Sequence, residues 1–198
     1  MKFLLLSFFL VVTTCGLKAQ PPHYLDSVTA FRQQYISTHG VIKEKERAGL
    51  QFFAIDTAYC KPVRVEMIYE APWFAMPTSG KISKSFRVYA MLHFTIKGIP
   101  AKLTVYQSQQ LMQSEGYKDY LFIPFTDLTN GEQTYENGRY IDILTSDLEK
   151  EGFCIDFNKA YNPYCAYVSN VYNCPIPPDA NHLDIPIKAG EKKFSLPH

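Results

Sequence analysis

A strict alternation of apolar and polar residues over residues 86–96 constrains the fold of this chain most strongly. Apolar side chains occupy every second position there: Phe86, Val88, Ala90, Leu92, Phe94 and Ile96. Successive side chains of a strand point to opposite faces, so this spacing predicts a long strand with one buried face. A strand of this length needs partners, so we expect the chain to be organised around a sheet.

Other segments supply the partner strands. The Gly98-Ile99-Pro100 turn predicts a hairpin between the long strand and residues 103–106. Further strands are predicted at residues 63–66, 119–125, 139–144, 153–157 and 183–187. Tyr and Phe favour pleated, half-buried surfaces, and aromatic residues make up 15% of this chain. Short strands joined by short turns favour antiparallel pairing in a barrel-like sheet or a sandwich.

One helix is expected near the N-terminus. Tyr24, Val28, Phe31 and Tyr35 recur at helical spacing, which predicts a helix over about residues 24–38. The charged run that follows, residues 43–47, is expected to be a solvated connector or a short helix. A length of 198 residues suits one domain. The expected fold class is therefore α+β, mainly antiparallel β, with an N-terminal helix, in a single domain over residues 20–198.

Residues 1–19 are predicted to be a cleaved signal peptide. The apolar run after Lys2 is too short to span a bilayer and suits the core of such a signal. Cleavage after Ala19 is preferred, and lipidation of Cys15 is the alternative, although Thr14 fits a lipidation signal poorly. The expected location is periplasmic or secreted, or alternatively lipid-anchored in the cell envelope, without a transmembrane anchor in the mature chain.

The charge balance bears on the partners. Loss of Lys2 and Lys18 with the signal changes the formal charge from +1 to −1 (+1 minus two lysines). No basic stripe remains, so nucleic acid is not an expected partner. A small-molecule ligand is the expected partner instead.

Four cysteines remain after cleavage, namely Cys60, Cys154, Cys165 and Cys174. An even number in an exported chain permits disulfides, and four cysteines allow three pairings. The pair Cys165 and Cys174 is favoured because the loop between them is short and rich in turn residues.

The most informative polar stretch begins with two Asn-Gly pairs, at residues 130–131 and 137–138, which predict tight turns. These turns could gather Glu132, Tyr135 and Arg139 at one rim, together with Asp142. The simpler interpretation is a pair of turns with polar decoration. Arg139 could form an ion pair with a neighbouring carboxylate, or it could clamp an anionic ligand group.

The next stretch, residues 153–158, alternates in the opposite sense. Cys154, Asp156 and Asn158 share the face that Phe153, Ile155 and Phe157 do not occupy. Asp156 and Asn158 are therefore either site residues or caps of a local turn. The proline-rich segment 174–178 predicts a stiff loop that could close over an opening in the sheet.

The cysteines, histidines and carboxylates suggest three specific chemistries. Cys165 as a nucleophile would need His93 or His182 as its base. A zinc site built from Cys165, Cys174 and His182 has the wrong ligand spacing and competes with a disulfide, so no metal and no cofactor are expected. Paired carboxylates for acid–base work could come from Asp127, Glu132, Asp142 or Asp156.

Several long motifs resemble an uncharacterised bacterial and archaeal family, catalogued as domain of unknown function number 1684. The matching runs are FTDLTNGEQTY at 125–135, GRY at 138–140, DFNKAYNPYCAY at 156–167, CPIPP at 174–178, Asn181 and AGEK at 189–192, with MPTSG at 76–80 upstream. The resemblance covers essentially the mature chain. It implies membership but no activity, cofactor or catalytic residue.

Three functional hypotheses follow from these residues. The first is a small-molecule binding domain with a polar, tyrosine-rich site, because eight of the 14 tyrosines lie between Tyr117 and Tyr172. Its candidate ligand-binding residues are Asp127, Tyr135, Tyr140 and Asn162. The second is a hydrolase-type enzyme whose candidate catalytic residues, Glu132, Arg139, Asp156 and Asn158, must converge in one cleft. The third is a structural protein of the cell envelope.

Overall fold

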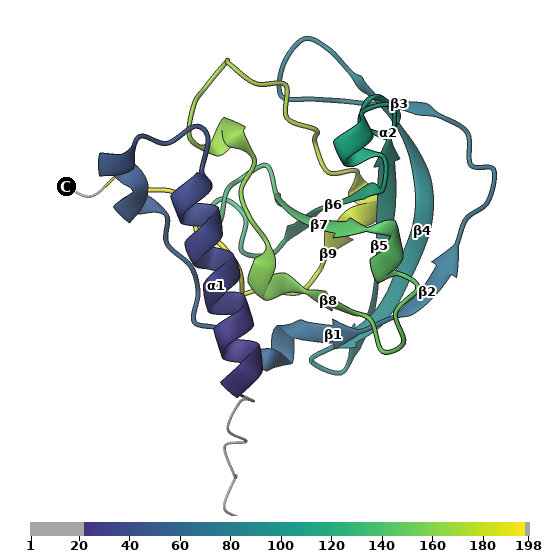
Figure 1. Cartoon of the computed structure of the whole chain (residues 1–198), viewed down its shortest axis with the longest axis horizontal. Coiled ribbons are helices and arrows are strands. Elements are labelled where there is room, and N and C mark those ends of the chain that lie inside the picture. The colour runs from purple at the N-terminus through teal and green to yellow at the C-terminus, as the bar shows by residue number, and fades with distance from the viewer. Residues whose placement is uncertain (1–21, 197–198) are drawn as a thin grey trace, which may run out of the picture.

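A computed structural model provides the structure of the protein and describes residues 22–196 (Figure 1). The predicted signal peptide, residues 1–19, lies outside the described residues, as does Cys15, the alternative lipidation site. Both expectations remain predictions from the sequence. Within the described range, no helix has both the length and the apolar character that crossing a bilayer requires.

The helices and strands occur in the order α1 (Pro22–Thr38), β1 (Cys60–Pro62), β2 (Arg64–Met67), β3 (Phe74–Met76), β4 (Lys84–Ile96), β5 (Ile99–Ser108), α2 (Gln109–Met112), β6 (Tyr120–Asp127), β7 (Arg139–Leu144), β8 (Cys154–Asp156) and β9 (His182–Leu183). The main sheet has the strand order β2-β4-β5-β6-β7, while β3 pairs with β4 and β9 pairs with β6. Strands β1 and β8 form a separate two-stranded sheet. All of these pairings are antiparallel except β6–β9.

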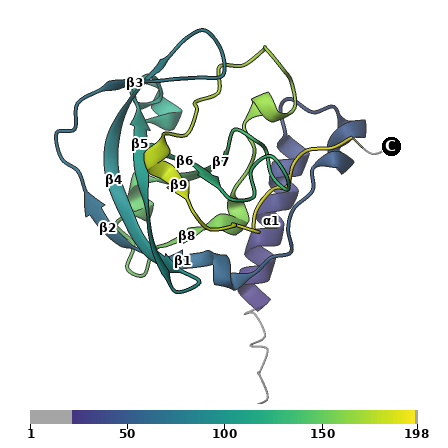
Figure 2. The ribbon, with the colours of Figure 1, turned by 180° about the vertical axis from the view of Figure 1, so that it is seen from behind.

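This architecture confirms the predicted fold class, a mainly antiparallel α+β fold with an N-terminal helix. The expectation named a barrel-like sheet or a sandwich, and the structure is sandwich-like. The strand path from β2 to β7 does not close into a barrel. Helix α1 lies on the opposite side of the molecule from the edge strand β2, and the view from behind agrees (Figures 1 and 2).

The long alternating segment forms most of β4, and β5 returns beside it as a hairpin in which Ile96 lies opposite Ile99. The two-residue turn has positive φ at both positions, 50° at Lys97 and 78° at Gly98. Such a turn matches the twist of the strands, and glycine adopts it without steric cost. The turn is therefore tighter than predicted, and β5 begins earlier than residue 103.

The predicted last strand, 183–187, is shorter in the structure, and Pro186 within it has no backbone N–H to donate. Pairing ends at Leu183, although the chain continues as an apolar, buried segment. Ile187 instead donates its backbone N–H to the Asp127 carboxylate at 3.0 Å. Side chains thus replace the missing strand partner.

The main sheet is apolar on both faces. One face packs against β1, β8 and the C-terminal segment through residues such as Leu92, Leu121 and Ile123. The other face carries a second, largely aromatic cluster of Met76, Phe86, Tyr106, Phe122 and Tyr140. Alternation along β6 assigns Leu121 and Ile123 to the first face and Phe122 to the second.

A fully buried ion pair joins the end of β6 to the start of β7. The Nη2 atom of Arg139 lies 2.8 Å from the Asp127 carboxylate, and both side chains are inaccessible to solvent. Arg139 also donates to the backbone carbonyls of Ile187, Ala189 and Glu191. The ion pair therefore holds the C-terminal segment against the sheet.

Replacing Arg139 with Met is expected to lower the free energy of unfolding by about 3–5 kcal/mol, because it leaves the Asp127 carboxylate buried without its partner. Urea denaturation measures the change. Lys193→Ala is the matched control, because it removes an ion pair with Glu136 whose side chains are 46% and 52% exposed. That change should cost less than about 1 kcal/mol. A similar loss in both variants would contradict a special role for the buried pair.

Candidate functional site

A groove of about 500 Å³ opens over the aromatic face of the sheet. Its walls come from α1, the ends of β4, β6 and β7, helix α2, and residues 161–175. The residues that line it are Phe31, Tyr35, Lys84, Leu111, Tyr117, Tyr120, Tyr140, Asp142, Tyr161, Pro163, Tyr164, Tyr172, Asn173, Cys174 and Pro175. A second cavity of about 210 Å³ shares Lys84, Leu111, Tyr120, Tyr140, Tyr161 and Pro175 with it, and so extends the groove along the sheet.

Strand alternation places the floor of the groove. Along β7, Tyr140 and Asp142 point to the aromatic face, while Ile141 points into the opposite core. An isolated bridge joins Tyr140 to Tyr161, so the chain after β8 runs beside the free edge of β7. The Tyr161 hydroxyl donates to the Asp142 carboxylate at 2.7 Å.

Asp142 is the acidic group of the groove. The residue is exposed at the surface of the groove, and the groups packed around its carboxylate reduce the hydration of the charged form, which raises the pKa of Asp142 to about 6. Hydrogen bonds from Tyr120 and Tyr161 oppose that shift. The carboxylate is therefore largely ionised at pH 7 and can accept hydrogen bonds from a ligand.

Lys84 is the basic group of the groove. Desolvation lowers the pKa of its ammonium group. Lys84 and Asp142 line the same groove, yet within the described chain no ion pair joins either of them to a charged partner. The groove thus presents two separate charges of opposite sign between aromatic walls.

A buried carboxylate supports the wall formed by α1. Glu191 is inaccessible to solvent and accepts hydrogen bonds from the Tyr35 and Tyr167 hydroxyls, at 3.1 Å and 2.6 Å, and from the backbone N–H of Asn162 at 2.8 Å. Burial raises the pKa of Glu191 to about 7. Because Tyr35 also lines the groove, Glu191 fixes part of its wall from behind.

His39 packs behind the same wall. Its ring centroid lies 5.3 Å from that of Tyr35 and 4.7 Å from that of Tyr167. Its Nδ1 atom accepts the backbone N–H groups of Val41 and Ile42, which assigns the ring proton to Nε2. Burial, followed by the nearby Arg47, lowers the pKa of His39. The neutral ring therefore acts as a packing element.

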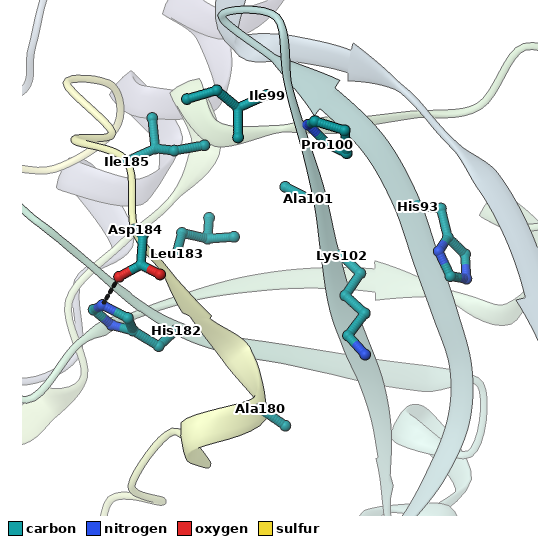
Figure 3. A pocket seen from close by; sticks show the side chains of 10 residues that line it. All are labelled: His93, Ile99, Pro100, Ala101, Lys102, Ala180, His182, Leu183, Asp184 and Ile185. Atoms are coloured by element: carbon teal, nitrogen blue, oxygen red, sulfur yellow. Dashed lines mark ion pairs between the residues drawn. The ribbon is translucent and has the colours of Figure 1, made fainter.

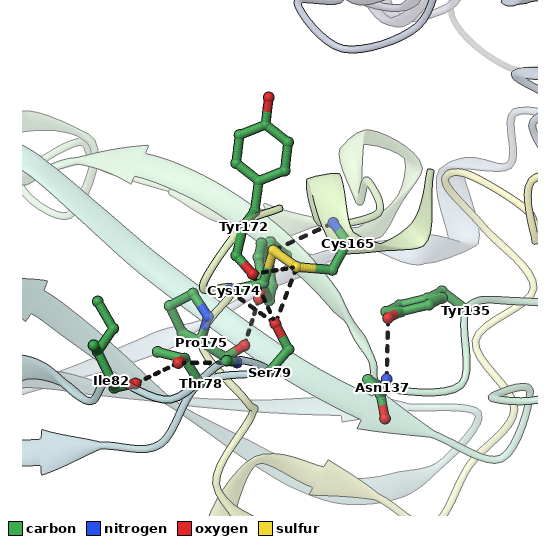
Figure 4. The surroundings of a disulfide bond; sticks show 11 residues. Thr78, Ser79, Ile82, Tyr135, Asn137, Cys165, Tyr172, Cys174 and Pro175 are labelled. Atoms are coloured by element: carbon green, nitrogen blue, oxygen red, sulfur yellow. Dashed lines mark hydrogen bonds between the residues drawn. A yellow bond between two sulfur atoms is a disulfide. The ribbon is translucent and has the colours of Figure 1, made fainter. Parts of the chain in front are cut away.

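Residues 164–175 form a strap over one side of the groove, and a disulfide closes it. Cys165 is bonded to Cys174, which confirms the favoured pairing (Figure 4). Ser79 binds this strap at both cysteines: its hydroxyl lies 3.0 Å from Cys165 Sγ and accepts the Cys174 N–H at 3.1 Å. The Tyr140 hydroxyl donates to the Pro175 carbonyl. The strap is thus tied to both the sheet and the 77–79 segment.

The second disulfide, between Cys60 and Cys154, joins β1 to β8. The cysteines of the described chain are therefore all paired. No group of three or more His, Cys, Asp and Glu side chains within residues 22–196 is arranged to hold a metal ion.

Asp127 and Arg139 lie apart from the groove. Both are fully buried, and the Asp127 carboxylate is also bonded by the Thr129 backbone and hydroxyl. The hydrogen bonds of the Arg139 guanidinium go to Asp127 and to backbone carbonyls, and its Cζ atom lies 5.3 Å from the centroid of the Phe125 ring. The predicted ligand-binding roles of these two residues find no support in this geometry, because a ligand cannot reach them.

Asp156 and Asn158 are brought together, but as caps. Asp156 accepts the Asn158 backbone N–H at 3.0 Å, and the Asn158 amide donates to the Tyr24 hydroxyl and the Asp56 carbonyl. The turn-capping alternative therefore describes their contacts. Glu132 is exposed on the turn after β6, and within residues 22–196 no hydrogen bond or ion pair joins it to Asp156 or Arg139. The four residues predicted for hydrolysis do not share a described contact network.

The remaining predicted ligand-binding residues differ in their placement. Tyr140 lines the groove. Asn162 is buried beneath it, where its amide donates to the Lys192 carbonyl at 2.8 Å. Tyr135 lies near the Asn-Gly turns, where its hydroxyl accepts from Asn137. The residues that sequence reasoning missed are Lys84, Tyr120 and Tyr161, which are distant in sequence and meet only on the aromatic sheet face.

Another cavity, of about 440 Å³, lies between the start of β5 and the segment around β9 (Figure 3). It contains an ion pair of 3.3 Å between His182 and Asp184, whose carboxylate is 94% exposed. His182 also bonds the Thr126 hydroxyl. This cavity lacks the aromatic walls of the groove, so we take the groove as the candidate site.

Comparisons with known proteins place the chain among uncharacterised relatives. The family described as "Protein of unknown function (DUF1684)" matches residues 45–192. Among solved structures, the chain is similar to an uncharacterized protein from gene locus rrnAC0354 of Haloarcula marismortui, studied by solution NMR, at 27% identity and a TM-score of 0.64. That match covers 86% of this chain and 94% of the other. No curated protein matches the sequence.

The two disulfides should have separable effects. Loss of Cys60–Cys154, which closes a loop of 94 residues, should lower the free energy of unfolding by about 4.5 kcal/mol, and loss of Cys165–Cys174, with a separation of 9, by about 2.5 kcal/mol. Hydrogen exchange should quicken selectively across residues 161–175 only in the Cys165→Ala/Cys174→Ala variant. Equal protection of that segment in both double variants would show that the disulfide does not hold the strap.

Stability should fall as the pH rises from about 4.5 to 7. The folded protein keeps the Glu191 proton over a range where the unfolded chain, with the ordinary pKa of 4.5, loses it. This protonated carboxyl contributes roughly 3 kcal/mol at low pH, and the contribution is lost as the pH rises through the raised pKa. Urea denaturation at pH 5–8 should show Glu191→Gln gaining stability relative to the parent as pH rises. A difference that does not change with pH would refute this assignment.

Proposed function

Because the chain belongs to the DUF1684 family, whose description assigns no activity, we propose a function from the geometry of this chain itself: it binds a small molecule with a flat, largely apolar body in the tyrosine-lined groove. Seven tyrosines converge on that one cavity, namely Tyr35, Tyr117, Tyr120, Tyr140, Tyr161, Tyr164 and Tyr172. This convergence is the observation that carries the proposal.

The dimensions and chemistry of the groove suit such a ligand. Small-molecule sites usually enclose about 300–1,000 Å³ and combine aromatic walls with a few polar groups. The groove of about 500 Å³ falls in that range and contributes Asp142 and Lys84 as its charged groups. Tyrosine presents an apolar ring for stacking and a hydroxyl for hydrogen bonding, so it can hold a ligand that has both kinds of surface.

We further propose that binding takes place outside the cytoplasm, in the periplasm or after secretion. The two disulfides support this location, because disulfides persist in oxidising compartments. The predicted signal peptide of residues 1–19 points the same way. Lipid anchoring at Cys15 remains the alternative way to retain the protein in the cell envelope.

The other two hypotheses are less well supported. Hydrolysis by Glu132, Arg139, Asp156 and Asn158 has no shared cleft, since none of the four lines the groove. A purely structural role would not account for the groove. Exposed apolar residues do surround its rim, including Tyr164 and Tyr172 at 43% and 38% exposure, but they border a cavity rather than a flat patch.

The neutral fluorescent probe N-phenyl-1-naphthylamine tests the groove directly. We expect it to bind the parent protein with a rise in fluorescence, and we expect Tyr172→Ala to weaken binding about tenfold by removing one stacking wall. Tyr172 is exposed at the rim, so its removal should leave the fold intact. Titration followed by fluorescence and by amide chemical shifts provides both affinity and location.

Tyr69→Ala is the matched control, because Tyr69 is 81% exposed and does not line the groove. The affinity of the Tyr69→Ala variant for the probe should equal that of the parent protein. Equal weakening by both substitutions, or chemical shift changes confined to other surfaces, would exclude the groove as the binding site.

A further inference from the structure

The two charged residues of the groove constrain the ligand beyond its apolar body. Asp142 and Lys84 are opposite in sign, line one cavity and do not pair with each other. A charge held among aromatic walls loses hydration, and the loss is offset only when an opposite charge or a hydrogen-bonding partner replaces water. The Tyr161 hydroxyl donates one hydrogen bond to the Asp142 carboxylate. Within the described residues, no side chain replaces the water lost by the Lys84 ammonium group.

The sheet register separates the two charges. Phe122 lies opposite both Tyr106 and Asp142, and Tyr106 lies opposite Val88. Asp142 is therefore three strands away from Val88, or about 14 Å, and Lys84 lies about 13 Å farther along β4. The Cα atoms of Lys84 and Asp142 are thus roughly 20 Å apart along the sheet surface. Both residues line the groove, so the reach of the two side chains can shorten the gap between the charged groups.

A complementary ligand must therefore carry a cation and an anion several bonds apart. In an α-amino acid the ammonium and carboxylate groups are both bonded to the Cα atom. Such a ligand is too short to reach both charged residues and could pair with only one of them. An extended tripeptide spans about 10 Å between its termini, and it fits the groove volume. Its backbone would also offer acceptors and donors to the tyrosine hydroxyls, and its side chains would lie against the rings.

We propose that the groove binds short peptides with free termini, with the terminal ammonium group at Asp142 and the terminal carboxylate at Lys84. This inference rests on the proposed binding function and specifies its ligand class. The aromatic rings of the groove add to the attraction for an ammonium group, because the face of an aromatic ring carries a partial negative charge that attracts cations. The two charged residues would bind the termini and the tyrosine rings would contact the rest of the ligand, so peptides with aromatic or aliphatic side chains are preferred.

Isothermal titration with the tripeptide phenylalanyl-glycyl-leucine tests the proposal. Four forms are compared on the parent protein: the free peptide, the N-acetylated peptide, the C-terminal amide and the doubly blocked peptide. Each block should weaken binding about tenfold, because it removes one charge. Equal affinity for the free and doubly blocked peptides would overturn the proposal without any variant being needed.

Two substitutions assign each terminus to its residue. Asp142→Asn should abolish the penalty for N-acetylation and keep the penalty for amidation, whereas Lys84→Gln should do the reverse. The exposed residues Asp26 and Lys81, replaced by Asn and Gln, are the matched controls and should keep both penalties. Retention of both penalties in Asp142→Asn and Lys84→Gln would show that the peptide binds elsewhere.

The neutral probe tests the binding function separately from the peptide as its ligand. If N-phenyl-1-naphthylamine binds the groove and no form of the peptide does, the peptide class is wrong and the binding function stands. If a lone amine such as phenethylamine binds as tightly as the peptide, the groove recognises a cation only and the role of Lys84 is wrong. If neither probe nor peptide reaches the groove, the proposed function fails as well.

Discussion

The buried pair of Arg139 and Asp127 is the interaction on which the rest of the structure depends. It lies where β6 ends and β7 begins, and it captures the carbonyl groups of the C-terminal segment as that segment crosses the sheet. A buried ion pair needs further hydrogen bonds to offset its desolvation, and here the two Nη atoms of Arg139 donate to backbone carbonyls as well as to Asp127, whereas its Nε atom is buried without a hydrogen-bond partner among residues 22–196. Through these bonds the ion pair holds the backbone of the C-terminal segment at Ile187, Ala189 and Glu191.

The position of Glu191 in turn connects the ion pair to the groove. Gly190, at a φ of 76°, makes the turn that presents Glu191, and a side chain at this glycine would meet the Ala160 carbonyl at 2.6 Å. In this position Glu191 accepts hydrogen bonds from the Tyr35 hydroxyl of α1 and from the Tyr167 hydroxyl of the strap. Three segments far apart in sequence are thus held by one carboxylate, and the wall of the groove is a consequence of that junction.

Sequence patterns predicted the fold better than the site, for a physical reason. Alternation is a local property of a strand, so residues 86–96 predicted β4. The expectation of one buried face was wrong, because a β-bulge between Val88 and Ala90 turns Phe86 to the aromatic face while Leu92 stays in the opposite core. Along β7, alternation puts Arg139 on the face of Ile141 and Ile143, toward the core. The ion-pair interpretation of Arg139 was therefore accessible from sequence. The groove was not, because Lys84, Asp142 and Tyr161 meet only through strand order and the path of the chain after β8.

The groove also explains why the sheet can be apolar on both faces without a second full layer of structure. The face that carries Phe122 and Tyr140 is covered only in part, by α2 and by the strap that the Cys165–Cys174 disulfide closes. Tyrosine is suited to such a boundary, because its ring packs on the apolar sheet while its hydroxyl faces water or Asp142. Phe122 and Tyr140 are buried on this face, whereas Tyr164 and Tyr172 at the rim of the groove are 43% and 38% exposed. Hydrogen bonds from Glu191 hold the neighbouring wall at Tyr35, and the disulfide ties the rim. Such preorganisation would lower the entropic cost of binding the ligand that we propose for the groove.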